Sequence, residues 1–261
     1  MDLGLKGKNA AITGSSQGIG KAIANSLADE GCNVALSARN QDRLDQAVAE
    51  CEAKGVKAVG IICDLSTEDG CAKFIEEAGS QLGDLDILVN NVGGMIPGTL
   101  DSMTEETWGT VLNTNLMSFV YTTKYAVPHL KKSSAGRILN VSGVTGKQLL
   151  PGALTTTIPN TAIHGFAKIM AAELGPDGIT VNTICPGFTN TESWGPRAEG
   201  MAKMKGITPD QVRDGISGQT LLGRWADPQE IGDAAAWIVS EKNSYQTGTV
   251  VEVCGGFSKY I

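Results

Sequence analysis

Short apolar segments rich in β-branched residues alternate with longer segments of helical periodicity along almost the whole chain. Strands are predicted at residues 9–13, 33–37, 56–63, 86–90, 137–141, 179–184 and 249–253. Helices are predicted at residues 18–30, 41–54, 68–81, 104–131, 159–174 and 227–240. Because strand, helix and next strand form a right-handed crossover, this order favours a parallel sheet covered by helices on both faces. The predicted fold class is a three-layer α/β/α architecture with a doubly wound parallel sheet.

The chain is expected to form a single domain over residues 1–261, because no linker, repeat or low-complexity tract interrupts this order. The least regular stretch covers residues 188–222, after the sixth predicted strand. Ligands of such sheets bind outside the carboxyl ends of the strands. We therefore expect residues 188–222 to act as a substrate lid.

The charge of the chain disfavours nucleic acid and anionic membranes as partners, because 28 acidic residues outnumber 21 basic ones and leave a net charge of −7. The six cysteines are scattered and no histidine lies near them, so no metal site is expected. The first residues lack the apolar core of a signal peptide, and no apolar run reaches the about 18 residues of a membrane span. We expect a cytoplasmic protein with free thiols.

A glycine-rich turn joins the first predicted strand to the first predicted helix. It reads Thr-Gly-Ser-Ser-Gln-Gly-Ile-Gly over residues 13–20. Its glycines permit a tight turn, a close approach of backbone N–H groups to a phosphate, and close packing of the helix on the strand. The position between a strand and a helix indicates a dinucleotide site. A plain strand-to-helix turn is the alternative.

With this turn, the chain resembles the short-chain dehydrogenase/reductase family over essentially its whole length. The other matching segments are Asn-Asn-Val-Gly at 90–93, Asp64, Asn115 after Trp108, Pro-Gly at 186–187, Gly-Arg at 223–224, Pro-Gln-Glu-Ile at 228–231, Gly248, and Gly-Gly at 255–256. The resemblance implies a Rossmann-type fold and a nicotinamide dinucleotide as cofactor. The residues implied to bind it are Gly14, Ser16, Gln17, Gly18, Ile19, Gly20, Asp64 at the adenine, Leu65, Asn91, Val92, Gly93, Pro186 and Gly187 at the nicotinamide, and Thr189.

The end of the second predicted strand favours NADP(H) over NAD(H). A carboxylate at this point would accept hydrogen bonds from the ribose hydroxyl groups of NAD. The chain instead has Leu-Ser-Ala-Arg over residues 36–39, and the guanidinium of Arg39 suits a 2′-phosphate. Gln17, in the glycine turn, is not the second basic residue that many NADP-using relatives carry. The alternative for Arg39 is a solvated charge at the start of a helix.

The catalytic set of the family is asparagine, serine, tyrosine and lysine, and only the asparagine is matched, by Asn115. Alignment of residues 136–138 and 165–168 with the family places Gly143 at the serine, Thr156 at the tyrosine and Asn160 at the lysine. In the family the tyrosine exchanges a proton with the substrate oxygen, and the lysine lowers the pKa of the tyrosine. The candidate catalytic residues of this chain are Asn115, Ser142, Lys147, Thr156 and Asn160.

Lys147 is the candidate substitute for the missing proton donor. It follows the fifth predicted strand toward the expected pocket, where it would act as an acid or as a fixed positive charge on a developing alkoxide. A solvent-exposed loop lysine is the alternative. Thr156 is expected only to hydrogen-bond the substrate oxygen, because an alcohol is a poor acid at neutral pH. His164 is expected at the surface or in an interface.

Pro159 predicts a helix that begins near it. Proline is tolerated in the first turn of a helix and disfavours helical geometry in the residue before it. Residues 155–157 are therefore predicted to form a loop, so that Thr156 and Asn160 would not share a helix face.

These features predict an NADP(H)-dependent oxidoreductase that acts on a carbonyl or alcohol group of a small molecule with an altered catalytic set. Two alternatives stay open at this stage: a lyase, isomerase or hydrolase on the same scaffold, and a catalytically silent subunit. The resemblance implies a homodimer or homotetramer formed through the helices at 104–131 and 159–174, with contacts from the last strand.

Overall fold

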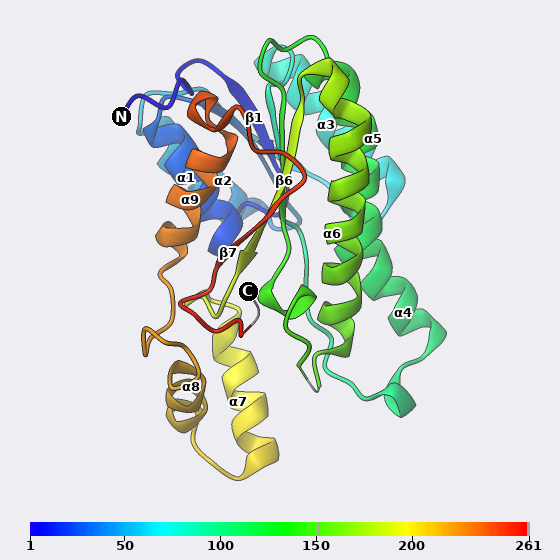
Figure 1. The fold of residues 1–261 in the computed structure, drawn as a ribbon, viewed down its shortest axis with the longest axis vertical. Helices are drawn as coiled ribbons and strands as arrows, with labels where there is room; N and C mark the ends of the chain where they lie inside the picture. Colours follow the sequence, from blue (N-terminus) through cyan, green and yellow to red (C-terminus); the bar gives the residue numbers. More distant parts are fainter. Residues whose placement is uncertain (151, 260–261) are drawn as a thin grey trace.

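A computed structural model describes residues 1–150 and 152–259 and contains a seven-stranded parallel sheet between two layers of helices (Figure 1). The strands lie in the order β3-β2-β1-β4-β5-β6-β7. Their bounds are β1 Asn9–Ile12, β2 Asn33–Ala38, β3 Ala58–Ile62, β4 Ile87–Asn90, β5 Arg137–Val141, β6 Thr180–Pro186 and β7 Val250–Val253. The predicted fold class is confirmed, and the strand bounds differ from the prediction by one or two residues at most.

Each face of the sheet has its own helices and its own core. Helices α1 (Gly18–Asp29), α2 (Gln41–Glu52) and α9 (Pro228–Val239) cover one face, and α3 (Glu68–Leu82), α5 (Ser118–Leu130) and α6 (Leu154–Leu174) cover the other (Figure 1). In β1, Ile12 packs into the first core and Ala11 into the second. Strands buried on both faces read as continuous apolar runs, which is why the sequence predicts them well.

The order of the strands reverses beside β1. The chain moves from β1 outward to β2 and β3, and then returns to place β4 on the other side of β1. Connections that leave in opposite directions open a crevice at the carboxyl ends of the strands, where ligands of such sheets bind. The loops after β1, β4, β5 and β6 border this point.

The long helix predicted at 104–131 is present and contains a π-helical turn. It consists of α4 (Glu105–Leu112), a π-helical segment (Asn113–Met117) and α5. Thr104 caps α4, because its hydroxyl accepts a hydrogen bond from the Thr107 backbone N–H at 3.2 Å. A π-helical turn often marks a functional position, and this one contains Asn115.

The prediction that the helix after β5 begins near Pro159 is wrong, because α6 begins at Leu154 and includes residues 155–157. Pro159 has no N–H to offer the carbonyl of Thr155, four residues earlier. A neighbouring segment compensates: Nδ2 of Asn115 lies 3.5 Å from the Thr155 carbonyl oxygen. The Thr155 hydroxyl also donates to the carbonyl of Ile96 at 2.8 Å. These tertiary contacts keep the first turns helical.

The lid predicted as irregular at 188–222 instead contains two helices, α7 (Trp194–Lys205) and α8 (Pro209–Ser217). Figure 1 shows the pair projecting beyond the end of the sheet. The helices share a small core of Ala198, Ala202, Val212 and Ile216, completed by Trp225. Because two of these residues are alanines among polar neighbours, their helical pattern is weak in the sequence.

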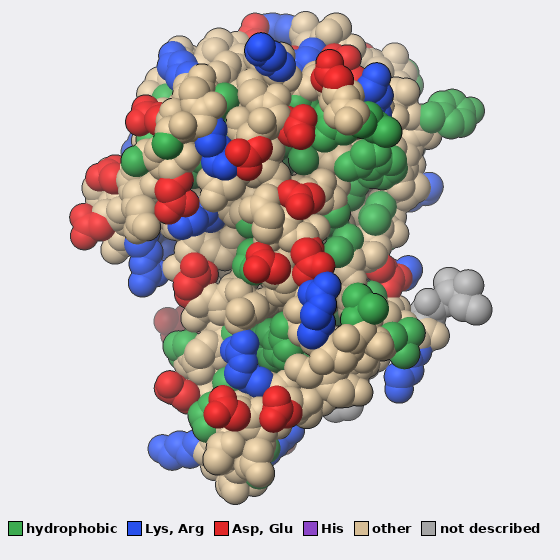
Figure 2. All heavy atoms as spheres, turned by 90° about the vertical axis from the view of Figure 1, so that its left-hand side faces the viewer, with side chains coloured by type: hydrophobic (Ala, Val, Ile, Leu, Met, Phe, Trp, Pro, Cys, Tyr) green, Lys and Arg blue, Asp and Glu red, His purple; other side chains and the backbone are tan. Residues whose placement is uncertain are grey.

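The surface carries charges of both signs. Figure 2 shows acidic and basic side chains interspersed over the face that carries α1, α9 and α8, with no continuous basic stripe on that face. All six cysteines are free, as predicted. Across residues 1–150 and 152–259, no helix combines the length and the apolar character needed to cross a lipid bilayer.

Candidate functional site

The glycine turn after β1 is held by the loop after β4. Nδ2 of Asn91 donates hydrogen bonds to the carbonyl oxygens of Thr13 and Gly14, both at 3.0 Å. The Thr13 hydroxyl in turn accepts from the backbone N–H groups of Asn91 at 2.7 Å and Val92 at 3.0 Å. The two loops therefore form one rim at the point where the strand order reverses.

The N-terminus of α1 is open to an anion. Gln17 occupies the N-cap position, and its side chain makes no hydrogen bond to the first turn, so the first N–H groups of the helix are available to a ligand. Gly14 and Gly18 have φ values of +60° and +58°, which favour glycine. A Cβ on Gly20 would lie 2.5 Å from the Gly14 carbonyl oxygen, so glycine is needed for the helix to approach the turn. This geometry fits a pyrophosphate.

Two arginines stand at the end of β2. Arg39 is exposed directly after the strand, and Arg43 lies in the first turn of α2. Nη1 of Arg43 donates to Oε1 of Gln17 at 2.8 Å, which links α2 to the glycine turn. Asn40 caps α2 by accepting from the Arg43 backbone N–H at 2.9 Å. Arg43 was not among the predicted site residues; the signal that would have found it is a second basic residue in the first turn of the helix that follows Arg39.

Asp64, predicted at the adenine, lies exposed after β3. Its Oδ1 accepts hydrogen bonds from the backbone N–H of Ser66 at 3.0 Å and from the Ser66 hydroxyl at 2.8 Å. These two bonds lower the pKa of the Asp64 carboxyl, and the positive charge of Arg39 adds to the effect. Asp64 is therefore a fixed negative charge beside Arg39.

The other predicted cofactor residues follow the carboxyl ends of the strands, but Thr189 is turned into the protein. The residues at the carboxyl ends of the strands are Ser16 and Ile19 after β1, Leu65 after β3, Asn91, Val92 and Gly93 after β4, and Pro186 and Gly187 at the end of β6. Thr189 is buried, and its hydroxyl donates to the Gly187 carbonyl at 3.2 Å. Thr191 faces the glycine turn instead, since a Cβ on Gly18 would lie 3.4 Å from it.

The side chain of Asn115 is committed to backbone groups. Its Oδ1 accepts from the Gly94 N–H at 2.8 Å, and its Nδ2 donates to the Gly94 carbonyl at 2.7 Å and approaches that of Thr155. Asn115 therefore connects the loop after β4 to the first turns of α6. This side chain positions the site.

Thr156 and Asn160 share one face of α6, contrary to the prediction, because they lie four residues apart within the helix. The Thr156 hydroxyl donates to the Ala153 carbonyl at 3.1 Å, and Nδ2 of Asn160 donates to the Thr145 hydroxyl at 2.9 Å. A Cβ on Gly143 would lie 2.9 Å from Nδ2 of Asn160. The Asn160 amide therefore fills the space into which a side chain at position 143 would extend.

His164 does not stand free at the surface, which was one of the two positions predicted for it; an interface stays a prediction. The ring is half-buried, and its Nε2 lies 3.0 Å from Oγ of Ser142 and 3.3 Å from Sγ of Cys185. Ser142 and Cys185 are themselves 3.0 Å apart. The reason is the register of β5 and β6, which brings these two side chains together under α6. Gly146 then lets the helix approach, since a Cβ there would lie 2.7 Å from the His164 ring.

Burial sets the charge of this cluster. Burial first, and then the positive charge of Lys147, lower the pKa of His164 below its ordinary value of 6.5, while Glu252 acts in the opposite direction. Burial also raises the pKa of the Cys185 thiol to about 11. At neutral pH the ring, the thiol and the Ser142 hydroxyl are therefore uncharged hydrogen-bonding groups.

Lys147 forms an ion pair with Glu252 on β7. The two side chains are 32% and 18% exposed, so the pair is partly shielded from water. Burial alone would raise the pKa of Glu252, but the hydrogen bond from Lys147 and its positive charge outweigh burial and lower that pKa. Lys147 is therefore a loop lysine that is only partly exposed, and its charge is compensated by Glu252 on β7 instead of being free for a substrate oxygen.

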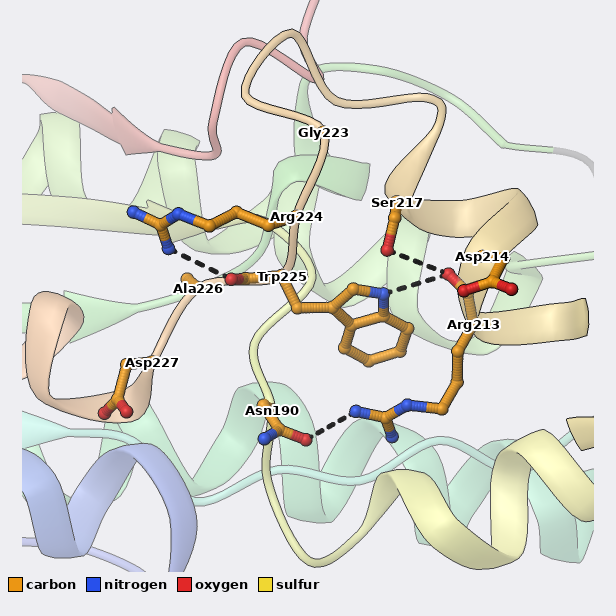
Figure 3. Close-up of a pocket in the computed structure, with 9 residues that line it drawn as sticks. All are labelled: Asn190, Arg213, Asp214, Ser217, Gly223, Arg224, Trp225, Ala226 and Asp227. Atoms are coloured by element: carbon orange, nitrogen blue, oxygen red, sulfur yellow. Dashed lines mark hydrogen bonds between the residues drawn. The ribbon is translucent and has the colours of Figure 1, made fainter. Parts of the chain in front are cut away.

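An open pocket of about 370 Å³ lies between α8 and the segment that leads to α9 (Figure 3). The Arg213 guanidinium lies 4.6 Å from the centroid of the Trp225 ring and donates to Oδ1 of Asn190 at 2.7 Å. The Trp225 indole N–H donates to the Arg213 carbonyl at 3.2 Å. None of the predicted site residues lines this pocket, and its contacts fasten α8 to the loop after β6.

Comparisons with known proteins place the whole chain among reductases. A family model described as "Enoyl-(Acyl carrier protein) reductase" matches residues 14–258. A 3-oxoacyl-[acyl-carrier-protein] reductase of Staphylococcus epidermidis is 33% identical over 250 residues, which cover 95% of this chain and 98% of the relative. The L-sorbose reductase of Gluconobacter frateurii, solved with NADPH and L-sorbose, is 32% identical with a TM-score of 0.95 and full coverage of both chains. An actinorhodin polyketide ketoreductase solved with NADPH is 29% identical with a TM-score of 0.92, covering 97% of this chain and 98% of that chain.

Proposed function

Because the chain belongs to the short-chain dehydrogenase/reductase family, we propose that it is an NADP(H)-dependent oxidoreductase that interconverts a carbonyl and an alcohol group of a small molecule. The observation that carries the proposal is the uncapped N-terminus of α1 beside the positive-φ glycines of the turn. Two of the similar solved structures contain NADPH. The bound cofactor would supply or accept the hydride.

The residues at the carboxyl ends of the strands fit such a cofactor. The glycine turn and the first N–H groups of α1 would hold the pyrophosphate. Asp64 and Leu65 would border the adenine, and Asn91, Val92 and Gly93 would line the rim opposite the turn. Pro186 and Gly187 would meet the nicotinamide, with Thr191 in the place that the resemblance implied for Thr189.

We assign the 2′-phosphate of NADP(H) to Arg39 and Arg43. The last residues of β2 and the residue after it, Ser37, Ala38 and Arg39, include no carboxylate that would bind the ribose hydroxyl groups of NAD. Gln17 orients Arg43 toward the turn. Calorimetric titration of NADPH and NADH into the wild type, R39A and R43A tests the assignment. Loss of one charge-assisted contact should weaken NADPH binding about 10- to 100-fold and leave NADH binding unchanged.

A matched control is K54A, which removes one positive charge at the far end of α2, where Lys54 pairs with Asp29. It should leave both affinities unchanged. Equal affinity of the wild type for NADPH and NADH, or an unaltered preference in both arginine variants, would refute the assignment to NADP(H).

For the chemistry, we propose that the substrate oxygen is bound beside Asn160 and Thr156. The Asn160 amide has a second N–H besides the one that it donates to Thr145. An amide releases no proton at neutral pH and an isolated alcohol is a poor acid, so the proton must reach the oxygen through a relay. In its imidazolium form, His164 would give the Nε2 proton to Oγ of Ser142, next to Gly143, while the Ser142 hydroxyl proton passes to the substrate oxygen. The neutral ring would then take a proton from solvent. His164 then acts through Ser142 and is a positioning residue.

The pH profile of turnover tests this relay. H164Q and Ser142→Ala should lower kcat about 100-fold with little change in KM, and H164Q should flatten the pH dependence of kcat. H129Q removes the other histidine, which lies against Asp84 at 3.0 Å, and should leave the profile unchanged. An H164Q profile that matches the wild type would refute the relay.

We further propose that α7 and α8 form the substrate lid and that the protein assembles as a homodimer or homotetramer. Exposed apolar side chains on α6 support the assembly: Ile158 is 42% exposed and Ile169 58%. Trp237 on α9 and Tyr245 before β7 are also exposed. Sizing by light scattering should give a multiple of the 27.2 kDa chain, and a monomer would contradict the proposal.

A further inference from the structure

The lid helix α7 carries a half-buried arginine whose charge is not compensated. Arg197 lies three residues after Trp194, the first residue of α7. Within residues 1–150 and 152–259, the guanidinium has no carboxylate or carbonyl partner. Burial alone lowers the pKa of Arg197 below its ordinary value, with no charged neighbour acting on it.

An arrangement of this kind is costly unless a ligand completes it. Moving a guanidinium out of water without a hydrogen-bond partner disfavours the folded state. The face of Trp194, 5.4 Å from the guanidinium carbon, offers a cation–π contact that recovers part of the loss. A cation–π contact uses none of the N–H groups, so the five N–H groups of Arg197 stay available as donors.

The position of Arg197 connects it with the candidate site. Thr191, six residues earlier, lies against the glycine turn at Gly18. The Trp194 ring packs edge-on against Phe188, with centroids 5.5 Å apart, and Phe188 directly follows the Pro-Gly segment at the end of β6. Arg197 is thus held at the base of the lid, one turn into the helix that begins beside the proposed nicotinamide position.

A second arginine of the lid provides the contrast. Trp194 and Trp225 form an edge-to-face pair with centroids 4.7 Å apart, and each ring carries one arginine. Arg213, on Trp225, donates to Asn190 and faces the open pocket in Figure 3. Arg197 makes a cation–π contact of the same kind with Trp194, at 5.4 Å instead of 4.6 Å, without the hydrogen bond. The missing partner of Arg197 is therefore not a general property of this aromatic cluster.

We propose that Arg197 binds an oxyanion group of the substrate, a carboxylate or a phosphate, so that the substrate is an acidic carbonyl or alcohol compound. This inference rests on the proposed oxidoreductase function. The planar donors of a guanidinium match two oxygens of such a group, and partial burial strengthens the interaction relative to water. A carboxylate and a phosphate would both bind in this way, and separate acid and phosphate probes distinguish them.

The test compares acidic carbonyl compounds with neutral analogues. NADPH oxidation is followed with 2-, 3- and 4-oxo acids and their methyl esters, and with fructose 6-phosphate and fructose. The wild type should prefer the acid or the phosphate by about 100-fold in kcat/KM. In R197M this preference should fall to near unity, and in R197K it should be partly retained. R213M, the matched control, should keep it.

A binding measurement separates failure of this inference from failure of the proposed function. The same probes are titrated in the presence of NADP⁺ while tryptophan fluorescence is recorded, and thermal unfolding confirms that each variant is folded. A saturable response to an anion, absent with its neutral analogue and lost in R197M, supports the site even when no probe oxidises NADPH. Equal responses of wild type and R197M, or a wild type that treats each acid and ester alike, would overturn it.

Discussion

The pH dependence of stability gives a direct test of the buried imidazole at the candidate site. In the unfolded chain the His164 ring has its ordinary pKa of 6.5, and in the folded protein burial and Lys147 lower that pKa, with Glu252 opposing them. Below pH 6.5 the unfolded chain therefore binds a proton that the folded protein does not bind. The free energy of unfolding must fall as the pH is lowered from 6.5 to the folded-state pKa, and level off below it.

The size of the effect is limited by the single proton involved. The slope is at most about 1.4 kcal/mol per pH unit, and solvent around the exposed part of the ring reduces it. Carboxylates whose pKa values are lowered, such as Glu252, contribute only as the pH falls through about 4.5 and below. Between pH 6.5 and 5, the change in the free energy of unfolding therefore reports His164 and not these carboxylates.

Guanidinium chloride unfolding of the wild type, H164Q and H129Q at pH 8, 6.5, 5.5 and 5 measures this slope. H164Q should lose the destabilisation between pH 6.5 and 5, and at pH 8 it should cost about 1 kcal/mol through the altered contact with Ser142. H129Q changes an exposed contact with Asp84, so it should keep the part of the pH slope of the unfolding free energy that is due to His164. Equal slopes for the wild type and H164Q would refute the reasoning.

Three further substitutions test the framework of the site. Asn115→Ala removes the bonds to Gly94 and Thr155, so the free energy of unfolding measured with denaturant should fall by about 2–4 kcal/mol; an unchanged value would show that the bonds contribute nothing. Gly20→Ala brings a Cβ against the Gly14 carbonyl and should cost about 1–3 kcal/mol and weaken NADPH binding in calorimetry. Gly109→Ala, where a Cβ meets open space, is its control, and equal effects would contradict the packing argument. Lys147→Met leaves the Glu252 carboxylate unpaired, so it should destabilise by about 1–2 kcal/mol at pH 7. The loss should be smaller at a pH well below 4.5, where the carboxyl is protonated even with its lowered pKa. A loss that is equal at both pH values would contradict the ion pair.

The sheet and its helices follow from local sequence signals. Residues 10–12 of β1 are all buried, so the strand reads as an uninterrupted apolar run. Helix ends are predicted from the sequence equally well. Gly31 follows the C-cap residue of α1, and its φ of +80° favours glycine. The roles of the glycine turn at 13–20 and of Arg39 can also be predicted locally, because they depend on residues adjacent in the chain.

The parts that the sequence predicts wrongly depend on contacts between distant segments. Pro159 signals a helix start, and contacts with distant segments make an earlier start acceptable: the Asn115 amide, 44 positions before Pro159, and the Ile96 carbonyl. His164 belongs to no motif in the sequence. Nothing near it in the chain indicates that Ser142 and Cys185 meet beneath its ring. Lys147 likewise finds its partner on β7. Side-chain pairs of this kind are set by the register of the sheet and not by local pattern.

The relation between Gly143 and Asn160 allows a last prediction about the proposed catalytic positions. With Asn160 present, a side chain at position 143 meets Nδ2 at 2.9 Å from its Cβ. Gly143→Ser should therefore cost about 1–2 kcal/mol in the free energy of unfolding, because the amide must leave its bond to Thr145. In N160A the space is empty, so the same serine substitution should cost little, and the double-mutant cycle should show favourable coupling.

The same geometry decides whether the family's usual chemistry is accessible to this fold. Because α6 begins at Leu154, positions 156 and 160 lie on one helix face, as the family's tyrosine and lysine do. T156Y with N160K should therefore fold, and adding G143S to this pair should cost less stability than adding it to the wild type. Denaturant unfolding measures the four variants of the cycle, and NADPH oxidation with a common ketone measures their activity. If Gly143→Ser costs the same in the wild type, in N160A and in the T156Y/N160K background, Asn160 does not fill the serine position, and the glycine and the asparagine are independent features of the site.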